Sequence, residues 1–176
     1  LAGDPEQLSI LEATLEADNI FYRRLPLNYA FHSAAMDSIK LPVIESLTNI
    51  QAKHSSTPFF STVTGAELSG TELGANYWWD NIRKPVQFQP AIEALITKGI
   101  TTFIEIGAHP VLKSYLNDEL KNSAHDGLVL ASVNKGDDSL SNIERTISNL
   151  IMAATPDLSS KIATLFPTIG TPVTLP

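Results

Sequence analysis

The segment 100–106, which reads ITTFIEI, constrains the fold of this chain more than any other part of the sequence. It is rich in β-branched residues and its apolar pattern is almost unbroken, which is typical of a strand buried on both faces of a sheet. Gly107 ends this strand, and the sequence then predicts a helix over 110–120 and a strand over 128–133. This order of strand, helix and strand favours an α/β fold with a parallel sheet.

The rest of the chain continues the alternation of helices and strands. Asp4 is a favourable N-cap residue, and Pro5 fits the first turn of a helix that we expect to run to Ala17. Pro42 is expected to kink or split a longer helix. The other predicted elements are a strand over 20–27, the helix over 33–53 that contains Pro42, a strand over 59–63, a loop over 64–75, and helices over 77–83, 90–98 and 139–153. From Thr155 onward, recurring prolines indicate a linker.

Composition and charge argue against several classes of protein. The formal net charge of -7 argues against nucleic-acid binding, which needs a basic surface to neutralise phosphates. The absence of cysteine rules out disulfides, thiolate metal sites and a cysteine nucleophile. No apolar stretch is long enough to span a bilayer, and the first residues do not form a signal peptide. We therefore expect a cytoplasmic protein without nucleic-acid or membrane partners. Because there is no initiator methionine, we also expect the chain to begin inside a domain.

Two of the four histidines are candidate functional residues. The spacing of the four fits no known metal motif, so no metal site is predicted. His32 and His109 each follow a predicted strand, and functional groups of open α/β sheets gather at the carboxyl ends of strands. For each of them an ordinary structural role remains the alternative.

The sequence offers a candidate base but no activated nucleophile. It contains no G-x-S-x-G, the strand-turn-helix motif that exposes a catalytic serine. Ser33 is next to His32 but badly placed to hydrogen-bond its ring, and we expect it to cap the following helix. Glu105 is expected to form an ion pair or hydrogen bond within the sheet rather than orient a histidine. The pair Trp78-Trp79 is expected to pack in the core, because few basic residues accompany it.

Four ordered segments are similar to one known family. They read RRLPLNYAFHSAAMD, PFFSTVTG, YWWDNIRKPVQF and FIEIGAHPVLKSYL. Together they resemble the acyltransferase domain of type I polyketide synthases and animal-type fatty acid synthases. The resemblance implies part of an α/β-hydrolase-like fold with an inserted ferredoxin-like subdomain. Residues 1–27 would end this insert, 28–135 would form the C-terminal part of the larger subdomain, and 136–176 would hold the last helix and the linker after the domain. The family's serine would lie before Leu1.

The resemblance also implies a mechanism. His32 matches the family's catalytic histidine, a general base for a serine that takes an acyl group from coenzyme A and passes it to the phosphopantetheine thiol of an acyl carrier protein. A backbone carbonyl orients this histidine in the family. The position taken to match is Asn81, so its carbonyl is expected to accept a hydrogen bond from Nδ1 of His32. The turn 107–110 matches a GPHP motif in which His109 is expected to be structural. No directly bound cofactor is implied.

The choice of substrate is implied by the four residues that end in His32. They read YAFH, whereas malonyl-preferring members usually read HAFH and methylmalonyl-preferring members YASH. Tyr29 and Phe31 are therefore expected to bind substrate. Phe31 should fill the space that an α-methyl group needs, which favours malonyl, while Tyr29 leaves methylmalonyl open.

The implied partners are an acyl carrier protein and the adjacent ketosynthase and linker domains of the same synthase. The leading prediction is part of a polyketide synthase acyltransferase that is inactive as this chain alone. Two alternatives stay open. One is a non-catalytic docking or linker fragment between synthase domains, which the missing serine favours and His32 disfavours. The other is a free-standing α/β hydrolase.

Overall fold

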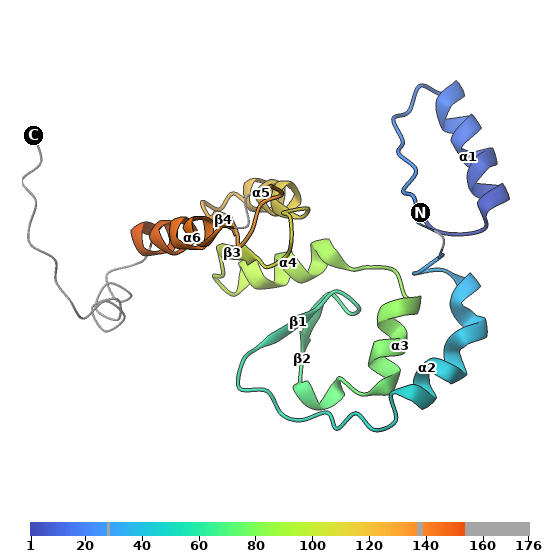
Figure 1. Ribbon diagram of the computed structural model, residues 1–176, viewed down its shortest axis with the longest axis horizontal. Helices are drawn as coiled ribbons and strands as arrows, with labels where there is room; N and C mark the ends of the chain where they lie inside the picture. The colour runs from blue at the N-terminus through green and yellow to red at the C-terminus, as the bar shows by residue number, and fades with distance from the viewer. Residues whose placement is uncertain (28, 137–138, 154–176) are drawn as a thin grey trace, which may run out of the picture. The chain divides into compact units, whose positions relative to one another are not determined.

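The computed structural model describes residues 1–27, 29–136 and 139–153, and the fold is mixed α/β. The chain divides into two compact units, Leu1–Lys98 and Gly99–Pro176, which we term the first and second units. The described part of the first unit contains α1 (Pro5–Ala17), η1 (Ala34–Ile39), α2 (Lys40–Ser46), β1 (Phe59–Ser61), β2 (Ala66–Leu68), η2 (Gly70–Glu72), α3 (Ala75–Arg83) and α4 (Phe88–Thr97) (Figure 1). The described part of the second unit contains β3 (Thr102–Glu105), α5 (Lys113–Asn122), β4 (Leu128–Ala131) and α6 (Leu140–Ala153). The boundaries expected near residues 27 and 135 divide the chain differently and stay a prediction.

Helix α1 has the bounds that its sequence predicts. Oδ1 of Asp4 accepts hydrogen bonds from the backbone N–H groups of Glu6 and Gln7, at 2.9 and 3.1 Å. None of the residues of α1 is buried. The strand predicted over 20–27 is wrong, because this segment is neither helical nor paired with another strand. A strand needs a neighbour for its backbone N–H and C=O groups, and no segment in the described residues supplies one here.

The helix predicted over 33–53 was expected to be kinked or split at Pro42, and the structure has two elements here, η1 and α2, which follow each other directly. The break falls between Ile39 and Lys40 rather than at Pro42. Pro42 lies in the first turn of α2, where the missing N–H would have no helical partner. The helix ends at Ser46, short of the predicted end. Both η1 and α2 pack against α3, and Met36 of η1 is buried.

A hairpin of β1 and β2 lies between α2 and α3 in the sequence. The two strands are antiparallel, and Phe60 pairs with Glu67. β2 and η2 both fall in the segment 64–75 that was predicted as a loop. Gly65 lies in the turn with φ of +72°, and a Cβ atom there would approach Cβ of Pro90 to 2.7 Å. The turn therefore requires glycine at this position.

The core of the first unit lies on α3 and α4. Trp79 is only 4% exposed, and the buried hydroxyl groups of Tyr77 and Ser61 are hydrogen-bonded to each other at 2.9 Å. Helix α4 packs on β1 and β2 and buries Ala91, Ile92 and Ile96. Core packing of the tryptophan pair is thus confirmed for Trp79. Trp78 is 38% exposed and donates its indole N–H to the Leu73 carbonyl at 3.0 Å.

The second unit is built on a parallel pair of strands, as the sequence predicts. Phe103 of β3 pairs with Val129 of β4, and α5 and α6 both pack on β4. Burial of the first strand on both faces is a wrong prediction, because Ile104 is 43% exposed. The physical reason is that the helices of this unit, α5 and α6, pack mainly on β4 and leave one face of β3 partly uncovered. The buried apolar residues are Leu116, Leu120, Val129, Leu130 and Ala131.

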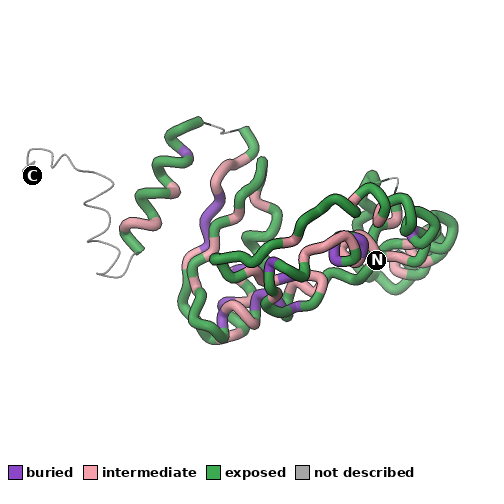
Figure 2. The backbone as a smooth tube through the Cα atoms, turned by 90° about the horizontal axis from the view of Figure 1, so that it is seen from below, coloured by how far each residue is buried: buried purple, intermediate pink, exposed green. Residues whose placement is uncertain are grey.

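Burial is limited elsewhere in the chain, and Figure 2 shows buried residues only as short purple stretches. In the part of the chain that the structure describes, no helix has the length and apolar character needed to cross a membrane. The linker predicted from Thr155 onward lies outside the described residues.

Candidate active site

The backbone of His32 is held in an unusual conformation by the end of α3. Its φ angle is +65°, in the left-handed region that costs a residue with a side chain about 1 kcal/mol or more. The N–H of His32 donates to the carbonyl of Ile82 at 2.8 Å. Ile82 lies in the last turn of α3, where carbonyl groups have no partner within the helix. An otherwise unpaired helical carbonyl thus stabilises the histidine backbone.

The imidazole of His32 is anchored by a second main-chain carbonyl. Its Nδ1 lies 2.8 Å from the carbonyl oxygen of Lys84. A carbonyl oxygen can only accept a hydrogen bond, so Nδ1 must carry the proton of the neutral ring. Nε2 then carries the lone pair. The His32 side chain is exposed, so this lone pair is accessible as a base.

The acceptor predicted for this ring was the carbonyl of Asn81, and the structure corrects it. A backbone carbonyl does hold Nδ1, but it belongs to Lys84, closer to the end of the same segment. Asn81 lies inside α3, one residue before Ile82, whose carbonyl accepts from the backbone N–H of His32 rather than from its ring. Lys84 is the C-cap, with φ of -80° and ψ of 154°. Pro85 follows it and disfavours the helical conformation at Lys84, so the carbonyl of Lys84 turns out of the helix.

The segment 32–37, which we term the His32 loop although it includes the first four residues of η1, has two further constraints. The Ser33 hydroxyl donates to the carbonyl of Ala30 at 2.7 Å and accepts from the N–H of Ala35 at 3.3 Å. Ser33 is therefore the N-cap of η1, as predicted. At the other end of the loop, the Arg83 guanidinium donates to the Asp37 carboxylate at 2.6 Å. This hydrogen bond holds the pKa of the Asp37 carboxyl below its ordinary value and raises the pKa of Arg83.

Tyr29 and Phe31, the predicted substrate residues, lie together beside the histidine. Their ring centroids are 4.4 Å apart, and those of Phe31 and His32 are 6.4 Å apart. Both aromatic side chains are partly exposed, so neither is packed in the core. Tyr29 also lines a pocket of about 720 Å³ in the first unit. Its apolar lining includes Leu8, Leu11, Leu15, Leu25, Leu27 and Ala30.

In the second unit, the turn 107–110 is held by side chains as a structural feature. The Glu105 carboxylate accepts hydrogen bonds from the N–H groups of Val111 and Leu112, at 2.7 and 3.1 Å. Glu105 was expected to make its ion pair or hydrogen bond within the sheet; it accepts hydrogen bonds instead from the residues that follow the turn. Nδ1 of His109 accepts from the N–H of Lys135 at 3.3 Å. His109 therefore makes a contact that ties two loops together, in line with a structural role.

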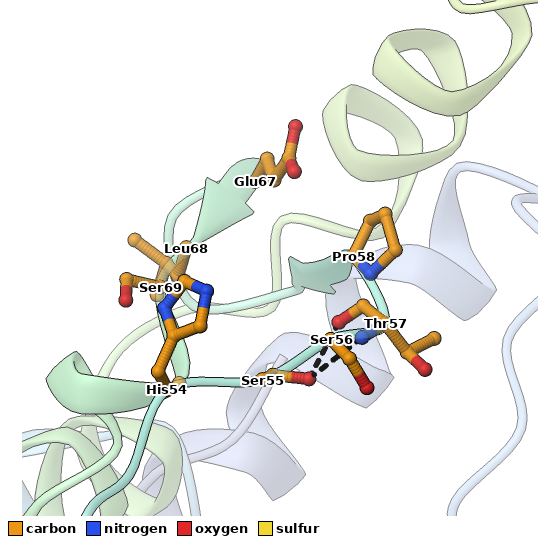
Figure 3. Close-up of a pocket in the computed structure, with 9 residues that line it drawn as sticks. His54, Ser55, Ser56, Thr57, Pro58, Glu67, Leu68 and Ser69 are labelled. Carbon is orange, nitrogen blue, oxygen red and sulfur yellow. Dashed lines mark hydrogen bonds between the residues drawn. The ribbon is translucent and has the colours of Figure 1, made fainter.

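A different hollow in the first unit, of about 390 Å³, lies around His54 (Figure 3). Its polar groups are largely engaged with one another. The Ser55 hydroxyl donates to the Thr57 carbonyl at 2.6 Å and accepts from the Thr57 N–H at 3.1 Å, while Glu67 forms an ion pair with Lys98. No group of acidic and histidine side chains that could hold a metal ion occurs in the residues described by the structure.

Sequence reasoning missed the residues that hold His32 in place. Ile82 and Lys84 act through main-chain oxygens, for which no side-chain motif exists. One signal was present, because a proline at 85 marks where α3 must end and where its last carbonyl groups become available. The pairing of Asp37 with Arg83 joins residues far apart in the sequence and left no local pattern.

Comparison with known proteins identifies relatives over most of the described chain. The family described as "Acyl transferase domain" matches residues 1–155. Polyketide synthase GfsE of Streptomyces halstedii is 37% identical over 140 residues, which is 80% of this chain and 4% of that protein. Pikromycin polyketide synthase component PikAII of Streptomyces venezuelae is 42% identical over 113 residues, or 64% of this chain and 3% of that protein. The chain therefore spans only a few per cent of these relatives.

Solved structures show the same fold. The acyltransferase domain from module 8 of the salinomycin polyketide synthase matches with a TM-score of 0.78 at 30% identity, covering 82% of this chain and 34% of that one. A loading acyltransferase from the avermectin modular polyketide synthase matches with a TM-score of 0.75 at 32% identity, covering 82% of this chain and 45% of that one. The mixed α/β fold described above is thus that of part of these domains.

Proposed function

Because this chain belongs to the acyl transferase domain family and forms part of an acyltransferase domain of a modular type I polyketide synthase, we propose that it helps to transfer a malonyl unit. The donor is malonyl coenzyme A, and the acceptor is the phosphopantetheine thiol of an acyl carrier protein. The observation that carries this proposal is the orientation of His32, whose Nδ1 is engaged by the Lys84 carbonyl while Nε2 stays available. The transfer needs such a base twice, once for each acyl-transfer step.

The proposed reaction has two steps that His32 serves in the same way. In the first, Nε2 takes the proton of a serine hydroxyl, the serine oxygen attacks the thioester carbon, and the thiol of coenzyme A leaves with a proton returned by the imidazolium. In the second, Nε2 takes the proton of the carrier thiol, whose sulfur attacks the seryl ester and releases the serine hydroxyl. The sequence contains no G-x-S-x-G, and we infer that the serine comes from another part of the synthase.

The hydrogen bond to Lys84 supports this chemistry in two ways. It selects the tautomer in which Nε2 is the base, and the Lys84 carbonyl oxygen continues to accept a hydrogen bond from Nδ1–H of the imidazolium that forms during each step. Because a carbonyl oxygen is neutral, it supplies this support without adding the negative charge that a carboxylate would bring. The proposal includes no metal and no directly bound cofactor, since acid–base and nucleophilic groups suffice for acyl transfer.

The proposed partners are the carrier protein and the neighbouring ketosynthase and linker domains, and we expect the reaction to take place in the cytoplasm. The alternative of a non-catalytic docking fragment gives no reason for the contacts around His32. A docking surface has no need of a histidine held at φ of +65° with one ring nitrogen directed at a carbonyl. These contacts favour the catalytic proposal.

The isolated chain is expected to transfer no malonyl group, because it contains a base without the serine. The complete acyltransferase domain should transfer malonyl to its carrier protein, which mass spectrometry detects as a mass increase on the phosphopantetheine arm. Both are assayed with malonyl coenzyme A under the same conditions. Thioester turnover by the isolated chain above the buffer rate, or no transfer by the complete domain, would contradict the proposal.

Replacement of Phe31 by serine in the complete domain is expected to raise the use of methylmalonyl relative to malonyl by about tenfold or more. The physical reason is that the Phe31 ring, packed on Tyr29, should fill the space that an α-methyl group needs. The measurement is the ratio of kcat/KM for the two substrates. Phe21→Ser is a matched control, because Phe21 is 90% exposed. An unchanged ratio in Phe31→Ser would show that this ring does not select the substrate.

A further inference from the structure

We propose that the ion pair between Arg83 and Asp37 positions His32 for proton transfer, an inference that rests on the function proposed above. The His32 loop is held at both of its ends. At its start, His32 bonds to the carbonyl groups of Ile82 and Lys84, and at its end Asp37 bonds to Arg83. The three partners of the loop, Ile82, Arg83 and Lys84, are consecutive in the chain. The end of α3 therefore fixes the loop as one piece.

The geometry of the ion pair suits positioning. Nε of Arg83 lies 2.6 Å from Oδ1 of Asp37, and Nη2 lies 3.4 Å from Oδ2. A two-point contact of this kind restricts orientation as well as distance. The side chains are 31% and 57% exposed, and an ion pair in contact with water adds little to stability. Its main effect should therefore appear in the position of the loop rather than in the stability of the fold.

His32 needs such support because its own backbone is unfavourable. At φ of +65°, the residue would relax if the loop were released from α3. The Ser33 hydroxyl holds the loop locally, between Ala30 and Ala35, but makes no contact with α3. Arg83 is the side chain that ties the far end of the loop to the helix that carries both anchoring carbonyl groups. Packing of η1 on α3, with Met36 buried, also holds this segment, so loss of Arg83 should loosen the His32 ring at the Lys84 carbonyl and displace Nε2 without releasing the segment.

Arg83→Gln in the complete acyltransferase domain tests this role. We expect kcat for malonyl transfer to the carrier protein to fall about 10- to 100-fold, since a displacement of about 1 Å can cost 10²-fold. KM for malonyl coenzyme A should stay within about twofold, because no substrate contact is removed. Glu67→Gln is the matched control, because it removes another exposed ion pair of the first unit, with Lys98, and should leave kcat unchanged. The reversed pair, Arg83→Asp with Asp37→Arg, should recover much of the lost kcat.

A spectroscopic readout reports on the ring independently of turnover. In ¹⁵N NMR spectra of the domain labelled at histidine, His32 should show a single Nδ1–H tautomer, and Arg83→Gln should give a mixture of tautomers. His32→Ala in the same domain separates the two proposals. If His32→Ala transfers malonyl at the normal rate, the proposed function fails. If His32→Ala is inactive while Arg83→Gln keeps normal kcat and a single tautomer, the positioning role alone is overturned. A reversed pair as slow as Arg83→Gln would overturn it as well.

Discussion

His32→Ala is expected to lower malonyl transfer by the complete acyltransferase domain by on the order of 10³-fold, because general acid–base catalysis contributes about 10²- to 10⁴-fold. Alanine keeps the backbone N–H that donates to Ile82, so the anchor of the loop survives and the loss falls on the chemistry. The deficit should appear in both steps, since each needs a base. The measurement is the initial rate of acyl-enzyme formation, followed by the rate of malonyl appearance on the carrier protein.

The matched control for this result is His54→Ala. His54 is also an exposed histidine of the first unit, but it lines the separate hollow of Figure 3 and makes no hydrogen bond to the His32 loop. Its replacement should leave both rates within about twofold of the parent rate, as is usual for surface positions. Equal rates for His32→Ala and His54→Ala would end the assignment of His32 as the base.

Trp79→Ala is expected to lower the free energy of unfolding by about 3–5 kcal/mol, the cost of emptying a buried aromatic position. Trp79 is only 4% exposed, and α3 is the helix whose last turn anchors His32. The loss should therefore appear in activity as well, because a disordered α3 cannot present the carbonyl groups of Ile82 and Lys84. The measurement is urea unfolding of the domain followed by far-UV circular dichroism.

Trp78→Ala provides the comparison within the same helix. This indole is 38% exposed, so its removal leaves a smaller cavity and the loss of one hydrogen bond to Leu73. The expected cost is about 1–2 kcal/mol. If the two substitutions proved equally costly, the core of the first unit would not be centred on Trp79.

Local chemistry allowed several elements to be predicted from the sequence. The N-cap of α1 at Asp4 and the Ser33 cap of η1 depend on side chains that bond to the nearest backbone groups, so neighbouring residues determine them. The end of the helix predicted over 90–98 falls at Thr97, two residues before Gly99, whose φ of +83° suits the residue after a helix. The parallel pairing of β3 with β4 followed from the strand-helix-strand order. The caps use information from neighbouring residues, whereas the strand pairing uses the order of elements over 100–133.

Elements that depend on distant neighbours were predicted poorly. The segment 20–27 has the composition of a strand but no partner in the described residues. The apolar run around Ile104 was expected to be covered on both faces, and the structure leaves one face partly exposed. Hydrophobic pattern reports what a segment can bury, not what lies beside it. The same distinction applies to the candidate site. The segment 29–32 could be recognised from the sequence, whereas the carbonyl of Lys84 that bonds the His32 ring could not.

The two anchors of His32 are peptide oxygens, and this has a consequence for how such a site changes over evolutionary time. The oxygen that residue 82 or 84 presents to the histidine belongs to the main chain and is the same whichever side chain the residue carries. Genetic drift at these positions would therefore leave the base oriented, and a comparison of side-chain letters would assign them no importance. A deletion or insertion between Trp79 and Pro85 would instead shift both oxygens out of register, so the length of this stretch is what inheritance must preserve.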